Sequence, residues 1–317
     1  MAKIYPDLFA PWMQEVVPKK NVLVQQGLVE VISSHPELSQ SGEFFTRPIQ
    51  EHIDNTGNTE QITTTTTLTL ATLNDKQEQV AVSHQGKGWS EVELNNILRG
   101  ANGLDQIASQ VAGYWARQYQ LFHVAAIKGA TDALIATHEY DYTGIGDGRM
   151  DLKAVTGGKA LLGETGEELD VLVVHTDVLY QLQVDGQIDY VNARTFADLI
   201  LVEGDIPVFN GLRVVVNNTL CAPTTGVYPS YLVSSAAKPW WMGFQRQLRV
   251  ETDRNILLGG GQDQVATYSD FAVTVKGMTW NVSVLNPEVT DLQTSTNWTQ
   301  VGETENIKYT RVLTQIT

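Results

Sequence analysis

The 317-residue chain contains a single cysteine, Cys221. A disulfide framework within one chain and a cysteine-built zinc site both need pairs of cysteines, so both are excluded. No hydrophobic run approaches the roughly 18 apolar residues that a membrane-crossing helix needs. The first residues, Met1 to Asp7, contain a proline and an acid where a signal peptide needs an unbroken apolar stretch. We therefore expect a protein that is made in a cytosol and has no membrane partner.

Basic residues are also scarce. The chain has 21 Lys and Arg against 36 Asp and Glu, a formal net charge of −15. Tight binding to DNA depends on cationic side chains that displace counterions from phosphates, so this excess of acid repels nucleic acid on average. The hydrophobic fraction of 42% is nevertheless large enough to form a sizeable core. We expect a folded, acidic protein without sequence-specific DNA binding.

Motifs of catalysis and cofactor binding are nearly absent. The sequence has no phosphate-binding G-x-x-x-x-G-K-[ST] motif, and its six histidines never occur at the spacing of a metal site. One catalytic pattern remains, Ser235-Ala236-Ala237-Lys238, in which the lysine would help to deprotonate the serine. Its companion motifs are missing, and Pro239 disfavours a continuing helix. We expect no enzyme activity, no metal and no cofactor, and keep a cytosolic serine hydrolase as a minor alternative.

What the chain does have near the N-terminus is a series of segments whose apolar residues cannot form a core of their own. Residues 1–41 are interrupted by prolines and have only short apolar clusters, so they are expected to form an arm that lies against another surface. An arm of this kind either straps its own domain or contacts a neighbouring copy.

A threonine-rich segment follows. Gln61–Leu73 alternates as a β-strand, and Gln77–His84 is expected to return as its partner after a turn at Asn74 to Lys76. An isolated hairpin is marginal in water, so it needs a partner surface, either its own domain or a neighbouring copy. Three residues of its apolar face are candidate assembly contacts: Ile62, Leu68 and Leu70.

A long helix is expected next. Ser90 and Glu93 form a capping-box pattern, which predicts that a helix begins there. Apolar residues spaced by three, four or seven then predict a helix over Asp105–Lys128 that Gly129 ends. From Glu139 to Asp170 the chain is acidic and glycine-rich, which favours exposed loops.

The remainder mixes short strands and helices without the alternation of βαβ units, so the fold class is α+β. Strands are expected at six places: Asp170–Val174, Leu212–Val216, Tyr228–Ser234, Leu248–Thr252, Gln264–Lys276 and Thr279–Leu285. A short helix is expected from Thr176 through Leu182.

This order of elements resembles the major capsid proteins of tailed bacteriophages, which have the Hong Kong 97-type fold. Sequence stretches that carry the resemblance are Leu172 to Tyr180, Asn210 to Val216, Ala266 to Val273 and Lys276 to Trp280. The resemblance implies an N-terminal arm over residues 1–41, an extended β-hairpin loop over 42–89, and a spine helix with part of a peripheral domain over 90–170. It further implies a mainly axial domain over 171–250 and a return to the peripheral domain over 251–317.

The resemblance implies a structural protein that assembles with itself into hexamers and pentamers of an icosahedral shell around double-stranded DNA. Its implied partners are a separate scaffolding protein, a portal and a decoration protein, and its implied location is the virion, assembled in the host cytoplasm. An encapsulin-like shell that encloses a cargo enzyme is the alternative within the same fold. Between Lys238 and Arg254 the charge is locally positive, so Arg246, Arg249 and Arg254 are further candidate assembly contacts, facing an acidic loop of a neighbour.

Overall fold

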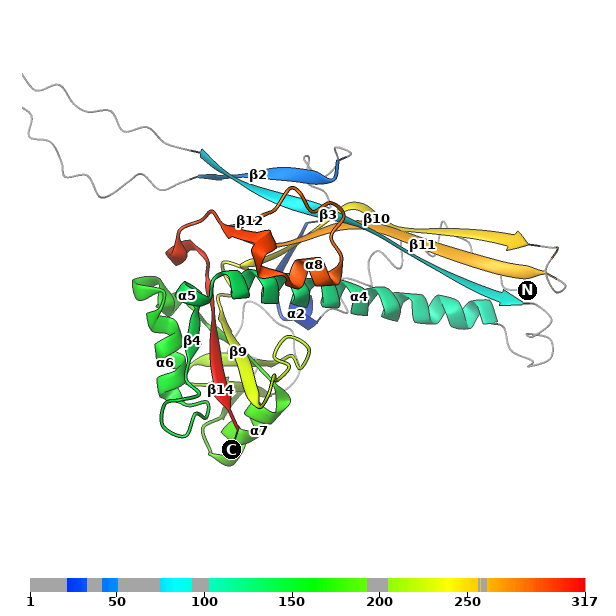
Figure 1. The fold of residues 1–317 in the computed structure, drawn as a ribbon. Helices are drawn as coiled ribbons and strands as arrows, with labels where there is room; N and C mark the ends of the chain where they lie inside the picture. The colour runs from blue at the N-terminus through cyan, green and yellow to red at the C-terminus, as the bar shows by residue number, and fades with distance from the viewer. Residues whose placement is uncertain are drawn as a thin grey trace, which may run out of the picture.

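The computed structural model describes residues 22–32, 42–50, 75–92, 103–192, 205–255, 257 and 261–316. A long helix, α4 (Gly103–Ala133), runs along one face of an elongated sheet and ends beside a second, more compact sheet (Figure 1). At a rise of 1.5 Å per residue, this 31-residue helix is about 46 Å long. The helix therefore connects the two halves of the molecule.

The first sheet has the strand order β1-β10-β11-β3-β2. Only β1 and β10 run parallel, and the other neighbours are antiparallel. Its strands are β1 (Val29–Ile32), β2 (Phe44–Gln50), β3 (Asp75–Val92), β10 (Trp240–Asn255) and β11 (Gln262–Val275). β3, β10 and β11 follow α4 toward its N-terminal end, while β2 and the start of β3 extend past β12 (Met278–Trp280) in the other direction (Figure 1).

The apolar stripe of α4, whose spacing predicted the helix, packs against β11. Trp115 donates its indole N–H to Thr267 Oγ1 at 2.9 Å, and Tyr119 Oη lies 2.6 Å from Ser269 Oγ. The ring of Tyr119 meets that of Phe271 edge-on at 4.9 Å. Because alternate residues of a strand face opposite sides, residues 267, 269 and 271 of β11 face the helix and residues 268 and 270 face away from it.

The second sheet has the order β4-β14-β9-β5-β8-β7-β6. Its strands are β4 (Glu139–Asp141), β5 (Val171–Val174), β6 (Asp189–Asn192), β7 (Asp205–Phe209), β8 (Leu212–Val216), β9 (Val227–Val233) and β14 (Tyr309–Gln315). All four residues of β5 are buried. One face packs on α6 (Leu152–Ala160) and α7 (Thr176–Val184), and the other face joins the core that contains α4.

Smaller elements join these parts. A two-stranded ladder pairs β12 with β13 (Trp298–Gln300), and α8 (Val289–Gln293) packs on α4. The remaining short helices are α2 (Val22–Gln25), α5 (Ile135–His138) and the 3-10 turns η1 (Gly163–Glu168), η3 (Ser295–Asn297) and η4 (Thr304–Asn306).

The helix predicted over Asp105–Lys128 is confirmed as part of α4, but the helix start predicted at Ser90 and the helix end predicted at Gly129 were wrong. Ser90 does not cap a helix, because Ser90 to Val92 end β3 and pair with residues 262–264 of β11. Gly129 does not end α4, which continues to Ala133. Gly129 is instead a close-packing position, since a Cβ there would lie 2.0 Å from the Leu292 carbonyl oxygen of α8. In both places a contact distant in sequence overrides the local signal.

The position predicted for the turn of the hairpin was wrong. Asp75 and Lys76 belong to β3, where they pair with Gln50 and Ile49 of β2. Gln77–His84 is a strand as predicted, but it pairs with β2 and then with β11. The threonine-rich segment Gln61–Leu73, with Ile62, Leu68 and Leu70, lies outside the described residues, so its predicted contacts stay a prediction.

Three further predictions need correction. The stretch from Glu139 to Asp170 is not all loop, because Asp151 caps α6 by accepting a hydrogen bond from the Ala154 amide at 2.8 Å. The predicted strand Thr279–Leu285 is confined to β12, since the Asn281 side chain accepts from the Ser283 amide and turns the chain. The helix at Thr176 extends to Val184, with His175 rather than Thr176 as its N-cap. The other five predicted strands are confirmed; Leu212–Val216 matches β8 at both ends, and the other four have shifted ends.

Candidate assembly surfaces

The end of the first sheet exposes an apolar side chain at the turn between β10 and β11. Leu257 is 91% exposed there, and Glu251 and Asp253 of β10 are exposed beside it. Burying a leucine side chain contributes roughly 1.5–3 kcal/mol, and Leu257, which is nearly fully exposed, leaves most of this gain for a contact with another chain. The turn is therefore a candidate contact surface.

The predicted arginines lie on β10, near the same end of the sheet. Arg246 and Arg249 point away from α4, because their register partners are Asp270 and Tyr268. Arg246 Nε is 3.5 Å from an Asp270 carboxylate oxygen, and the Arg249 guanidinium lies 5.7 Å from the centre of the Tyr268 ring. Their side chains are 69% and 61% exposed, so both remain accessible to another chain.

Arg254 lies closer to the turn and has a different environment. A Cβ at position 261 would lie 2.7 Å from Arg254 Nη2, and Gly261 has a φ of +119°. The guanidinium therefore lies across a glycine that leaves room for it. Arg254 contributes to the shape of the turn as well as to its charge.

At the opposite end of the sheet, β3 leaves the body together with β2. The backbone N–H of Gln79 donates to Thr279 Oγ1 at 2.9 Å, and Ser83 Oγ donates to the Pro287 carbonyl at 2.9 Å. The buried carboxylate of Glu78 accepts a hydrogen bond from the Gly277 amide. Hydrogen bonds that involve side chains thus attach this edge of β3 to the segment around β12. β3 and β12 form no strand ladder with each other.

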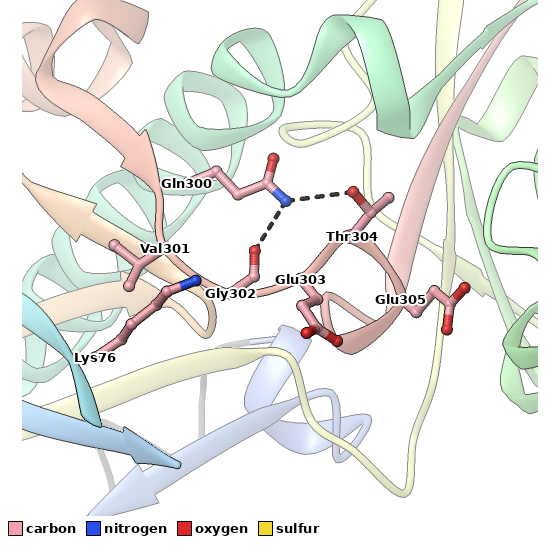
Figure 2. A pocket seen from close by; sticks show the side chains of 7 residues that line it. All are labelled: Lys76, Gln300, Val301, Gly302, Glu303, Thr304 and Glu305. Atoms are coloured by element: carbon pink, nitrogen blue, oxygen red, sulfur yellow. Dashed lines mark hydrogen bonds between the residues drawn. The ribbon is translucent and has the colours of Figure 1, made fainter. Parts of the chain in front are cut away.

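An open pocket of about 620 Å³ lies next to this attachment. It is lined by Lys76 and by the loop from Gln300 to Glu305. Figure 2 shows Lys76 directed from β3 toward Val301 and Gly302, with two glutamates farther along the loop. Gln300 Nε2 donates to the Gly302 carbonyl at 2.9 Å and fixes the loop. The pocket is polar and open, which suits a protein surface better than an enclosed small molecule.

The second sheet carries an exposed apolar face on α7. Val184 is 86% exposed, Tyr180 is 59% exposed, and Tyr190 of β6 is 56% exposed. Gln183 Nε2 donates to Tyr190 Oη at 2.6 Å, which holds the tyrosine against the helix. Large apolar side chains gathered in this way are typical of interaction surfaces.

The catalytic alternative finds no support in the geometry. The Ser235 hydroxyl and amide both bond the Asp170 carboxylate, so they join β9 to the start of β5. No described contact links Ser235 to Lys238, whose φ of +45° places it in a turn. Cys221 is buried, its thiol lies 3.5 Å from the Val173 carbonyl, and burial raises its pKa. These groups stabilise the fold and are not arranged for nucleophilic attack.

Burial also keeps a core histidine neutral. The pKa of His123, inside α4, is lowered to about 4 because burial penalises the charged ring. Within the ranges that the structure covers, no three His, Cys, Asp or Glu side chains are placed to hold a metal ion. The described helices include none long and apolar enough to cross a membrane.

Sequence reasoning missed the buried Glu78, the pocket at Lys76 and the exposed face of α7. Leu257 alone had a local signal, as an apolar residue between Asn255 and the glycines at 259–261. Nothing in the sequence around Glu78 indicates burial, because its partner Gly277 is 199 positions away.

Comparison with known proteins gives the family. The family model described as Gp13-like, major capsid protein 13-like, matches residues 39–310. The major capsid protein of Bacillus phage SPP1 is 22% identical over 316 residues, which is 96% of this chain and 94% of that relative.

Solved structures agree. The capsid asymmetric unit of cyanophage Pam1 is similar with a TM-score of 0.57 and 11% identity, covering 94% of this chain and 93% of that one. A structure from Mycobacterium phage Cain is similar with a TM-score of 0.55 and 12% identity, covering 95% and 90%. The predicted α+β capsid fold is confirmed, and neither the hydrolase nor the encapsulin alternative is favoured. The chain belongs to the Gp13-like family of major capsid proteins, structural proteins that form the phage shell and are not enzymes.

Proposed function

We propose that this chain assembles into hexamers and pentamers that close into an icosahedral shell around double-stranded DNA. The observation that carries this proposal is the exposure at the ends of the first sheet. Leu257 lies in the turn between β10 and β11, and Arg246 and Arg249 lie on the face of β10 that points away from α4, where their side chains are largely exposed. A surface that offers both apolar and charged groups at an extended edge suits contact with a second copy.

The proposed domain roles follow the resemblance. Residues 1–41 act as an arm, 42–89 as the extended loop, 90–170 as the spine helix with part of the peripheral domain, 171–250 mainly as the axial domain, and 251–317 as the return to the peripheral domain. The exposed face of α7 would then belong to the axial domain. The Arg246 and Arg249 side chains would face an acidic loop of a neighbour, and Ile62, Leu68 and Leu70 would be buried on an adjacent subunit.

The proposed partners include proteins that act during assembly. A separate scaffolding protein guides the shell, a portal occupies one vertex, a decoration protein binds outside, and assembly takes place in the host cytoplasm. The DNA is enclosed without sequence recognition. It is also bound only weakly, because the net charge of −15 disfavours strong phosphate binding.

Expression of the full chain with and without a candidate scaffolding protein tests the proposal. Analytical ultracentrifugation should detect capsomers or closed shells, and electron microscopy should show icosahedral particles with five-fold and six-fold clusters. Purified subunits should bind duplex DNA only weakly at physiological salt. A 35.0 kDa monomer at every concentration, without particles under either condition, would contradict the proposal.

A further inference from the structure

Glu78 is a buried carboxylate where β2 and β3, which belong to the proposed extended loop, join the body. We define the arm base, which is distinct from the proposed N-terminal arm over residues 1–41, as β2, residues 75–81 of β3 and the turn at Lys276 and Gly277. Glu78 is only 2% exposed, although it lies on a strand whose neighbours Lys76 and Gln77 are exposed. A carboxylate loses most of its hydration in such a place, and this loss must be offset by local partners.

The partners offset this loss only in part. Glu78 Oε1 accepts the Gly277 amide hydrogen bond. Glu78 Oε2 has no hydrogen-bond partner and is 3.9 Å from Arg47 Nη1, which has none either. Burial raises the pKa of Glu78, against the smaller lowering effects of the Gly277 amide, Arg47 and Lys276. The charged form is therefore poorly accommodated by the closed arm base.

The anchor on the other side of this contact is firmly held. Gly277 has a φ of +88°, and a Cβ there would lie 2.7 Å from Ile307 Cγ1. Its carbonyl accepts from the amides of Val301 and Gly302 at 2.9 and 3.0 Å. These residues belong to the loop that lines the pocket of Figure 2. Opening of the arm base therefore means that Glu78 leaves a fixed point of attachment.

Each neighbouring element contributes its own charges. Arg47 comes from β2, and Lys276 comes from the turn after β11. Lys276 is engaged at 2.7 Å with Glu30 of β1, and its Nζ also donates to the Ala237 carbonyl at 2.9 Å. Lys76 of β3 and Glu303 of the pocket loop lie farther along. The nearest cation to Glu78 that is not already paired closely is thus Arg47, which at 3.9 Å is outside hydrogen-bonding range.

We propose that Glu78 makes the arm base a pH-sensitive joint, which is held more firmly when its carboxyl group is protonated and less firmly when it is ionised. In the opened arm base the carboxylate regains water and its ordinary proton affinity, whereas in the closed one the proton is bound more tightly. The stabilisation of the closed form is therefore complete below the ordinary pKa of a glutamate and is lost as the pH rises through the raised value.

Hydrogen exchange of the full chain, read by mass spectrometry and corrected for the intrinsic rate at each pH, tests the joint. Protection of peptides covering residues 75–82 and 275–280 should increase between about pH 7.5 and pH 5, by up to about tenfold per unit of pKa difference. Peptides from β9 serve as the internal reference. Glu78→Gln should remove this pH dependence and match or exceed the wild-type protection at neutral pH.

Two variants complete the test. Glu43→Gln alters an exposed acid just before β2 and should keep the wild-type pH response. Arg47→Gln should reduce protection at neutral pH and leave it unchanged at low pH. The proposal fails if Glu78→Gln retains the wild-type response, if wild-type protection falls on acidification, or if Glu78→Gln opens the arm base at neutral pH. The joint belongs to the subunit, so its failure leaves the proposed shell untouched.

Discussion

The two sheets of this subunit differ in how they are covered. The second sheet lies between α6 and α7 on one side and the α4 core on the other, so that its central strand β5 is buried on both faces. The first sheet is covered by α4 on one face, and its other face is only partly covered: Trp241 and Ala272 are buried there in a small cluster with residues of β2 and β3, whereas Tyr268, nearer the turn, is 44% exposed. A sheet that is enclosed is stable by itself, whereas a long sheet with an open face has surface left for contacts with other chains.

The largest expected effect concerns the predicted threonine-rich strand Gln61–Leu73, which lies outside the described residues. Replacing both Leu68 and Leu70 with Asp should abolish shells, because each leucine is expected to bring roughly 1.5–3 kcal/mol of burial to an intersubunit contact. Thermal unfolding and circular dichroism of the unassembled subunit should be nearly unchanged. Electron microscopy and sedimentation measure the first result.

The matched control places the same charges on the opposite face, as Thr67→Asp with Thr69→Asp, and should assemble. If the leucine variant unfolds as a subunit, the segment packs on its own domain. If it forms normal shells, the segment is not an assembly contact.

The next effect tests whether α4 alone holds the first sheet. Trp115→Ala should lower the free energy of unfolding by about 3–5 kcal/mol, because a large buried ring and its bond to Thr267 are both lost. Denaturant unfolding measures the total loss of free energy of unfolding, and hydrogen exchange shows which strands lose protection. Protection of β11 should fall more than that of β5, and equal losses in both sheets would show that the two behave as one cooperative unit.

A smaller effect is expected from the cations of β10. Arg246→Glu with Arg249→Glu should reduce the yield of shells several-fold, since a contact with an acidic loop becomes repulsive. Subunit stability should change little because both side chains are exposed. Lys87→Glu, an exposed cation on β3, is the control. Equal loss with that variant would point to net charge rather than to a specific contact.

The smallest effect on the subunit is expected at the turn. Leu257→Ser should change the free energy of unfolding by less than about 0.5 kcal/mol, because the side chain packs on nothing in its own subunit. Its shells should dissociate at a lower denaturant concentration than wild-type shells. A clear loss of subunit stability would show that Leu257 packs within its own subunit. The two sheets would then differ less in how far they are covered.

Sequence reasoning recovered the features that depend on nearby residues. The stripe of Val111, Trp115 and Phe122 repeats within a few turns, so the helix and its buried face were predictable. The short strand at Val171–Val174 was predictable for the same reason. The overall order of these elements then identified the capsid family.

Features that depend on distant partners were not predictable. Ser90 has the chemistry of a helix cap, yet it pairs with Gln264 in a ladder that no local rule reveals. Gly129 resembles a helix end because the carbonyl of Leu292 that requires a glycine there is remote in sequence. The burial of Glu78 arises likewise from Gly277. Each error came from a position where a tertiary contact determines the residue.

The sheet order has a consequence for synthesis of the protein. β1 pairs with β10, and β3 pairs with β11, so the first sheet is incomplete until residue 275 has been made. In the second sheet β14 lies between β4 and β9, and it ends at Gln315. Pairings between such distant segments form slowly, and a growing chain exposes open strand edges meanwhile. Until β11 and β14 have been made, neither sheet is complete, so contacts between subunits that need the finished sheets form late in synthesis.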